Sequence, residues 1–218
     1  PPAMNLAMNS GNSICGNNNG SANVTATGGT NPYSYSWSTV PVQNTTNATG
    51  LSSGNYTVIV TDNSGCTISN NVIVNNTPGP VSSITNTNVS CNGGNDGSAT
   101  ATASAGTPPF TFSWNTIPVQ NTSVITGLTS GTYIVTVTDI NNCTVTNSTT
   151  ITEHNSLTLN ISKSDVTCNG ALNGGATAII VGGTPAYSYL WSTIPVQTSS
   201  TVTNLAPGSF SVSVTDSK

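Results

Sequence analysis

The 218-residue chain carries few charges, which limits both its core and its partners. Only 4% of its residues are charged and 34% are apolar, so several small cores fit better than one large core. The two Lys or Arg residues cannot neutralise a phosphate backbone, which excludes nucleic acid as a partner. No apolar run is long enough to predict a membrane span.

Three copies of one unit follow each other along the chain. The period of 77 residues is set by tryptophans and aspartates at matching places, namely Trp37, Trp114, Trp191, Asp62, Asp139 and Asp216. It predicts repeats at residues 1–76, 77–153 and 154–218. The linkers at residues 77–80 and 153–156 are short and stiff, so the three repeats are expected to form a rod.

The strands of one unit can be followed in the middle copy. Residues 81–90 are expected to form the first strand, and the Asn92-Gly93 pair predicts a turn after it. Small residues then alternate over positions 99–103, and aromatic residues alternate over positions 110–114. An aromatic face opposite a small-residue face is typical of the thin core between two sheets.

A second half of the unit follows and completes the expected sandwich. Residues 128–139 resemble the tyrosine corner of immunoglobulin-like and fibronectin-like domains, with Tyr133 at the corner. Tyr56 repeats this position in the first copy, and Phe210 takes it in the third without the hydroxyl. The predicted fold is therefore all-β, with three tandem β-sandwich repeats. Their core positions are expected to include Trp37, Trp114, Trp191, Tyr56, Tyr133 and Phe210.

The five cysteines fall in the same frame as the repeats. Cys15 and Cys66 stand at matching ends of the first unit, and Cys91 and Cys143 at those of the second, so pairing within each repeat is expected. Cys168 opens the third unit, and the period places its partner at position 220. The third repeat is therefore expected to be cut before its closing cysteine and last strand. Disulfides also indicate an oxidising, extracellular compartment.

One loop stays nearly identical in all three copies. It reads VPVQ at 40–43 and IPVQ at 117–120 and 194–197. A recent duplication with a proline-shaped turn explains the likeness, but apolar residues on a loop at a fixed interval also suit a contact. Contacts between repeats or chains are expected at Pro41, Val42, Pro118, Val119, Pro195 and Val196.

Little in the sequence suggests catalysis, metal binding or sugar binding. His154 is the single histidine and lies in a linker, so neither a catalytic triad nor a repeated zinc site can be assembled. Asp62, Asp139 and Asp216 lack nearby acidic partners, which favours turn caps over calcium ligands. The aromatic residues alternate as a buried face does, which favours core packing over sugar binding. No catalytic, metal or cofactor-binding residue is predicted, and the chain is not expected to be an enzyme.

The order of these motifs resembles the SprB repeat of Bacteroidetes surface proteins. In the middle copy the resemblance is carried by Cys91-Asn92-Gly93, by residues 97–102, 106–114 and 128–139, and by Cys143. It implies a long secreted adhesin on the bacterial cell surface, exported by the type IX pathway and used in attachment or gliding motility. The loop after the tryptophan departs from the family, which leaves open whether the parent is a gliding adhesin or another appendage.

Three functional hypotheses follow. The first is a stalk and adhesive element of a surface adhesin, whose partners are neighbouring repeats and surface glycans. The second is a subunit of a self-associating extracellular filament built from copies of this chain. The third is a carbohydrate-binding array attached to a secreted enzyme. Many Asn-x-Ser/Thr triplets make attached glycans plausible in each case, although a chain this rich in Asn, Ser and Thr forms such triplets by chance.

Overall fold

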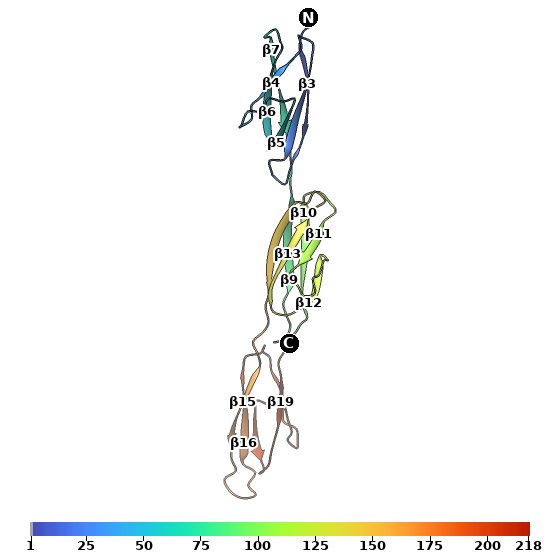
Figure 1. Ribbon diagram of the computed structural model, residues 1–218. Helices are drawn as coiled ribbons and strands as arrows, with labels where there is room; N and C mark the ends of the chain where they lie inside the picture. Colours follow the sequence, from blue (N-terminus) through green and yellow to red (C-terminus); the bar gives the residue numbers. More distant parts are fainter. Residues whose placement is uncertain (1) are drawn as a thin grey trace. The chain divides into compact units, whose positions relative to one another are not determined.

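The computed structural model describes residues 2–218, which form strands β1 to β19 and no helix (Figure 1). Here repeat 1 denotes strands β1–β8, repeat 2 strands β9–β14 and repeat 3 strands β15–β19. The β-branched residues that fill these strands have the alternating burial expected of sheets with one covered face.

Repeat 1 is built from two antiparallel three-stranded sheets. One sheet has the order β1-β3-β5 and the other the order β4-β6-β7. The first contains Asn5–Gly11, Gly20–Thr27 and Asn47–Leu51, and the second contains Ser34–Trp37, Gly54–Thr61 and Thr67–Val74. A short parallel pair joins β2 (Ser13–Ile14) to β8 (Asn76–Thr77) at the end of the module.

The two sheets of repeat 1 enclose one core. Trp37 of β4 is 1% exposed and lies in one cluster with Ala22 of β3 and Ala48 of β5. Small residues on one sheet thus leave room for the indole of the other, as the sequence predicted. The indole Nε1–H donates to the Thr45 carbonyl at 2.9 Å, so burial leaves no polar atom of the ring unsatisfied.

Repeat 2 uses the same strand order, and within the described residues repeat 3 uses it without a third strand in its second sheet. In repeat 2 the sheets are β12-β10-β9 and β11-β13-β14, and in repeat 3 they are β15-β16-β18 and the pair β17-β19. The strands of repeat 2 are Pro80–Thr87, Gly97–Ala105, Thr111–Trp114, Val124–Leu128, Gly131–Thr138 and Thr144–Ile151. Those of repeat 3 are Thr158–Ser164, Gly174–Val181, Ser188–Trp191, Thr201–Leu205 and Val212–Thr215.

This strand order is that of immunoglobulin-like sandwiches. With the short β2 left aside, the strands of repeat 1 correspond in chain order to A, B, C, E, F and G, paired as A-B-E and C-F-G. The tyrosine corner is also present, since the Tyr56 hydroxyl donates to the Ser52 carbonyl at 3.1 Å. Tyr133 donates in the same way to Thr129 at 3.0 Å.

By compactness the chain divides into two units. The first comprises Pro1–Ile84, Ala101–Ser123 and Ile134–Asn147, and the second comprises Thr85–Thr100, Val124–Tyr133 and Ser148–Lys218. The division passes through repeat 2. The first unit holds the core of repeat 1, and the second holds repeat 3.

The predicted core positions hold for the three tryptophans and fail for one phenylalanine. Trp37, Trp114 and Trp191 are at most 3% exposed. Tyr56 and Tyr133 are half-buried at their corners. Phe210 is wrongly predicted, because it is 38% exposed. It has no hydroxyl to anchor it, and within residues 2–218 the sheet of β17 and β19 has no third strand to cover it.

Candidate functional site

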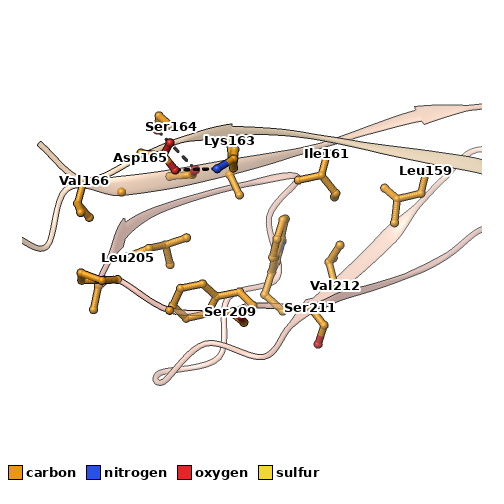
Figure 2. Close-up of a pocket in the computed structure, with 18 residues that line it drawn as sticks. Leu159, Ile161, Lys163, Ser164, Asp165, Val166, Leu205, Ser209, Ser211 and Val212 are labelled. Atoms are coloured by element: carbon orange, nitrogen blue, oxygen red, sulfur yellow. Dashed lines mark hydrogen bonds and ion pairs between the residues drawn. The ribbon is translucent and has the colours of Figure 1, made fainter.

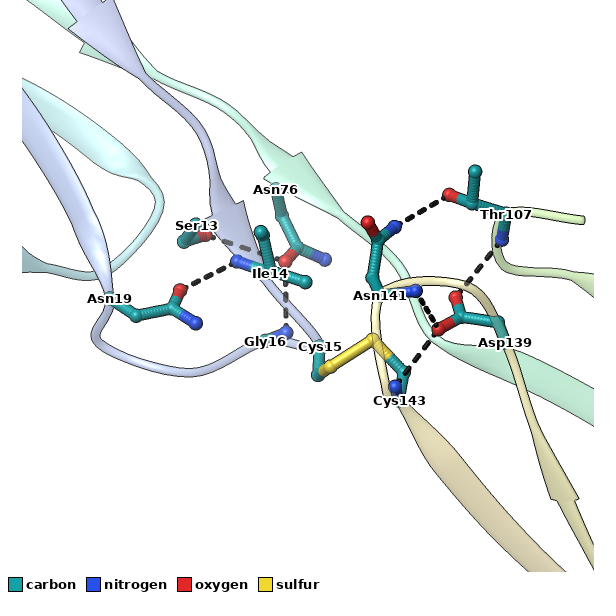
Figure 3. Close-up of a disulfide and its surroundings, with 10 residues drawn as sticks. All are labelled: Ser13, Ile14, Cys15, Gly16, Asn19, Asn76, Thr107, Asp139, Asn141 and Cys143. Carbon is teal, nitrogen blue, oxygen red and sulfur yellow. Dashed lines mark hydrogen bonds between the residues drawn. A yellow bond between two sulfur atoms is a disulfide. The ribbon is translucent and has the colours of Figure 1, made fainter.

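A disulfide joins Cys15 of repeat 1 to Cys143 of repeat 2 (Figure 3). The Cα atoms are 5.5 Å apart and the two residues are separated by 128 positions in the sequence. Both cysteines belong to the first compact unit. The bond is therefore a covalent link between consecutive repeats.

The turn that carries Cys15 is fixed to the start of the linker. The Cys15 N–H donates to the Thr77 carbonyl at 3.0 Å, and the Gly16 N–H donates to Asn76 Oδ1 at 2.9 Å. On the other side of the turn, the Ile14 N–H donates to Asn19 Oδ1 at 2.7 Å. These bonds hold the Cys15 sulfur beside the point where the chain enters repeat 2.

The hairpin that carries Cys143 is held by one carboxylate. Asp139 Oδ1 accepts the N–H groups of Cys143 and Asn141, each at 2.9 Å, and Oδ2 accepts the Thr107 N–H at 3.0 Å. Gly79 of the linker lies against this hairpin, since a Cβ there would come within 3.1 Å of Cys143 Cβ. A glycine in the linker thus permits the close approach that the disulfide needs.

The predicted pairs Cys15–Cys66 and Cys91–Cys143 are wrong. The Cys15 N–H donates to the Thr77 carbonyl, which lies three residues beyond the end of β7 at Val74. Cys66, by contrast, directly precedes the first residue of β7. A strand of that length separates its ends by roughly 25 Å. Bonded cysteines need Cα atoms within about 7 Å, so the two cysteines of one repeat lie at opposite ends of the module and cannot meet.

Three cysteines are free and exposed, namely Cys66, Cys91 and Cys168. Cys91 and Cys168 repeat the place of Cys15 in the sequence, and Cys66 repeats the place of Cys143. The second junction also resembles the first, because the Gly93 N–H donates to Glu153 Oε2 at 2.8 Å, as Gly16 does to Asn76. The arrangement around Cys15 is therefore partly reproduced around Cys91.

The three repeated aspartates cap turns, as the sequence predicted. Asp62 Oδ1 accepts the N–H groups of Ser64 and Cys66, and Oδ2 accepts that of Thr30. Asp216 likewise accepts the Thr184 N–H at 2.8 Å. Within residues 2–218 no three His, Cys, Asp or Glu side chains gather where they could hold a metal ion.

These hydrogen bonds change the acidity of the carboxyl groups. Burial acts to raise the pKa of Asp139, but the N–H groups of Thr107, Cys143 and Asn141 together bring that pKa below its ordinary value of 3.8. The pKa of Asp62 is lowered by the same balance. A carboxyl whose pKa is lower in the folded state stabilises the fold above its unfolded pKa and loses that effect as the pH falls through the folded pKa.

Replacing the Asp139 cap should therefore weaken repeat 2 and reduce its sensitivity to acid. We expect Asp139→Asn to lower the urea midpoint at pH 6, while the further loss between pH 4 and pH 2 becomes smaller than in the unmodified chain. Asp165→Asn, at an exposed carboxylate paired with Lys163, is the matched control and should leave the midpoint unchanged at pH 6. Equal acid sensitivity of the Asp139 variant and the unmodified chain would contradict the role of the cap.

The three conserved loops project apolar side chains from a fixed base. Thr39 is buried, and its hydroxyl donates to the Pro41 carbonyl at 2.8 Å and accepts the Gln43 N–H at 3.0 Å. The residue at the tip is fully exposed in every copy, at 100% for Val40, 101% for Ile117 and 100% for Ile194. The predicted contact residues Pro41, Val42, Pro118, Val119, Pro195 and Val196 are also exposed.

Two further features bear on the hypotheses. The aromatic rings of Trp37, Trp114 and Trp191 are enclosed in the modules, so they offer no open face to a sugar ring. In the part of the chain that the structure describes, no helix has the length and apolar character needed to cross a membrane.

Taken together, the strand order, the tyrosine corners and the link between repeats define a tandem immunoglobulin-like β-sandwich protein. The chain belongs to the SprB repeat family, whose sequence profile matches residues 8–42, 83–119 and 160–196. Each matched segment starts within the first strand of its repeat and ends in the loop after the tryptophan. The hairpins that carry Cys66 and Cys143 therefore lie outside the matched segments.

Solved structures that match the chain include proteins with several immunoglobulin domains. A structure that addresses Dscam isoform specificity is 15% identical, with a TM-score of 0.28, and the match covers 97% of this chain and 69% of that chain. The amphioxus IgVJ-C2 molecule is 16% identical, with a TM-score of 0.29 and coverages of 67% and 96%. No curated protein sequence matches the chain.

Proposed function

We propose that the chain is a non-catalytic repeat segment of a long extracellular adhesin on a bacterial surface, where it acts as a stalk and adhesive element in attachment or gliding motility. The supporting observation is the Cys15–Cys143 bond between consecutive SprB repeats. A link between modules serves a protein that must stay connected outside the cell, where disulfides persist. Export by the type IX pathway is part of this proposal.

This role can be tested in the cells that make the protein. The experiment measures whether the chain is exposed on the cell surface and what happens when the repeat segment is deleted or replaced. Antibodies raised against the chain should label intact cells, and deletion of the repeat segment should reduce attachment or gliding. An unrelated immunoglobulin-like array of equal length, inserted in its place, should restore a pure stalk but not an adhesive element. Labelling that requires permeabilised cells, or deletion without effect on attachment and gliding, would refute the proposal.

The exposed loop tips favour a second candidate, a self-associating extracellular filament. Val40, Ile117 and Ile194 place β-branched side chains in solvent at a regular interval, on loops whose bases are hydrogen-bonded. Isolated exposed apolar residues are common, but the same residue type at the same place in every repeat suits a repeating contact with another chain. Attached glycans on the uncharged surface belong to this proposal as well.

The loop tips can be tested directly. We expect the combined substitution Val40→Ser, Ile117→Ser and Ile194→Ser to lower self-association at least tenfold in sedimentation equilibrium without changing the melting temperature, because these side chains make no buried contact. The matched control replaces the exposed strand residues Ile59, Ile134 and Leu190 with Ser. Equal association of the loop variant, the control and the unmodified chain would leave the loops as ordinary turns.

A further inference from the structure

One side of every sandwich is formed by two short edge strands and the conserved loop that joins them. In repeat 1, β1 lies beside β7, so the opposite side of the sandwich is bounded by β4 and β5. The corresponding strands are β11 and β12 in repeat 2 and β17 and β18 in repeat 3. We call this the loop side. Edge strands present N–H and C=O groups that can pair with a strand of another molecule.

The edge strands of the loop side lack two common devices against such pairing. Lysine and proline on an edge strand discourage the addition of a further strand. The sequences here are SYSW and NATGL in repeat 1, TFSW and VITGL in repeat 2, and SYLW and TVTNL in repeat 3. None contains a charged residue or a proline, so the covering of these edges depends on the loop.

In repeat 1 the Gln43 side chain covers the outer edge of β5. The Val24 N–H donates to the Thr46 carbonyl at 2.9 Å, so these residues form a hydrogen-bonded pair at the end of the β3–β5 ladder. Such pairs alternate with pairs whose N–H and C=O groups point outward, and Thr49, three residues beyond Thr46, belongs to an outward pair. Gln43 Oε1 accepts the Thr49 N–H and Gln43 Nε2 donates to the Thr49 carbonyl, each at 2.9 Å. One side-chain amide thus occupies both groups that a further strand would use at this position.

The main chain of Gln43 covers the outer edge of β4. The Ser38 N–H donates to the Thr57 carbonyl at 2.9 Å, so Trp37, one residue earlier, turns its N–H away from β6. This N–H donates to the Gln43 carbonyl at 3.0 Å. A single residue therefore blocks one position on each of the two edge strands.

The other two repeats place a glutamine in the same way. The main-chain N–H of Trp114 donates to the Gln120 carbonyl at 3.0 Å. That of Trp191 donates to the Gln197 carbonyl at 3.1 Å, and Gln197 Nε2 donates to the Thr203 carbonyl at 3.4 Å. The chain has three glutamines, all at this position, although asparagine is frequent elsewhere. An asparagine side chain is one methylene shorter, which gives a physical reason for glutamine here.

The loop side keeps these bonds whatever covers the other side of the sandwich. In repeat 3, β19 pairs with β17 alone among the described strands. Figure 2 shows Leu159, Ile161 and Val212 around a hollow of about 730 Å³ on that other side. The main-chain bond between Trp191 and Gln197 is nevertheless the same as its counterpart in repeat 1. The cover of the loop side is therefore a property of each repeat by itself.

We propose that Gln43, Gln120 and Gln197 prevent the edge strands of one chain from pairing with those of a second copy of the chain. A second copy is the partner to be excluded, because β5 of one molecule and β5 of another are self-complementary in antiparallel pairing and carry no charge that would repel. The inference rests on the hydrogen bonds of the loop side and is independent of the proposed adhesin and filament.

Replacing the glutamines with alanine tests the proposal. The triple variant Gln43→Ala, Gln120→Ala, Gln197→Ala frees the outer groups of Thr49 but keeps the main-chain bonds of the loop. We expect amide hydrogen exchange at Thr49 to become about tenfold faster in dilute solution. Sedimentation equilibrium should show self-association strengthened at least about tenfold, with the Thr49 amide protected again in the associated state. The single substitution Gln43→Ala gives the same test in repeat 1 with less loss of stability.

Glutamate at the same positions separates protection of the edge from stability of the loop. A carboxylate cannot donate to the Thr49 carbonyl, so Gln43→Glu should also speed the exchange of the Thr49 amide. Its charge on the edge should nevertheless keep the chain as monomeric as the unmodified protein. The matched control Asn44→Ala changes the exposed neighbour of Gln43 and should alter neither exchange nor association.

A further variant separates the edges from the loop tips. The alanine variant should still associate when Val40, Ile117 and Ile194 are replaced with Ser, because the edge strands and not the tips make the contact. Equal association of the alanine and glutamate variants, or an alanine variant that stays monomeric although its Thr49 amide exchanges faster, would overturn the proposal.

Discussion

Stretching single molecules of the oxidised chain from its two ends should release far less length than stretching the reduced chain. The Cys15–Cys143 bond bypasses the intervening segment, because the two cysteines are 128 residues apart in the sequence. A fully extended chain gains about 3.5 Å per residue, so reduction should add roughly 45 nm of contour length. Force spectroscopy with and without a reducing agent measures this difference.

The same measurement distinguishes the bond between repeats from bonds within repeats. The double variant Cys15→Ser, Cys143→Ser should release its full contour length with and without the reducing agent. The variant Cys66→Ser should behave like the unmodified chain. A bond between Cys15 and Cys66 would instead hide only about 18 nm, since those residues are 51 positions apart. A change of length in the Cys66 variant would contradict the Cys15–Cys143 pairing.

Trp114→Ala should destabilise repeat 2 by about 3–5 kcal/mol, the usual cost of removing a large aromatic side chain from a core. Trp114 is 1% exposed, faces Val135 on the neighbouring strand, and donates its indole N–H to the Thr122 carbonyl at 2.9 Å. The substitution leaves a cavity and removes this hydrogen bond. Urea unfolding followed by hydrogen exchange of the β11 and β13 amides measures the loss.

The control for this substitution lies a few residues away in the same repeat. Val119 is 59% exposed, so Val119→Ser should change the free energy of unfolding by no more than about 0.5 kcal/mol. Repeat 1 should keep its protection in the Trp114 variant, because it has its own core around Trp37. A loss below about 1 kcal/mol, or parallel unfolding of repeat 1, would contradict the assignment of separate cores.

Local patterns in the sequence predicted the features that one repeat determines by itself. The alternation around Trp37 placed the indole inward, and the position of Tyr56 placed the hydroxyl bond to Ser52, because both depend on residues close in sequence or on the two-residue period of a strand. The aspartate cap was predictable for the same reason, since Asp62 binds the N–H groups of the turn that follows it.

The disulfide could not be read from the period, because the period gives the position of a cysteine in the repeat but not its end of the module. Strand β7 separates Cys66 from Thr77, the residue that is hydrogen-bonded to Cys15. The length of this strand places the two cysteines at opposite ends of the module and excludes a disulfide within one repeat. The predicted burial of Phe210 was wrong for a related reason. Its burial depends on a strand that pairs with β19, and aromatic character alone cannot supply that strand.

The order of the cysteines along the chain gives the disulfide a consequence for biosynthesis. Cys15 is made first, and its partner follows 128 residues later, after Cys66 and Cys91 have appeared. Any earlier bond to Cys66 or Cys91 has to be exchanged, because thiolate attack is the route between pairings. The Cys15–Cys143 bond can therefore form only after the second repeat has been synthesised and has folded, so its presence shows that the two repeats were assembled in chain order.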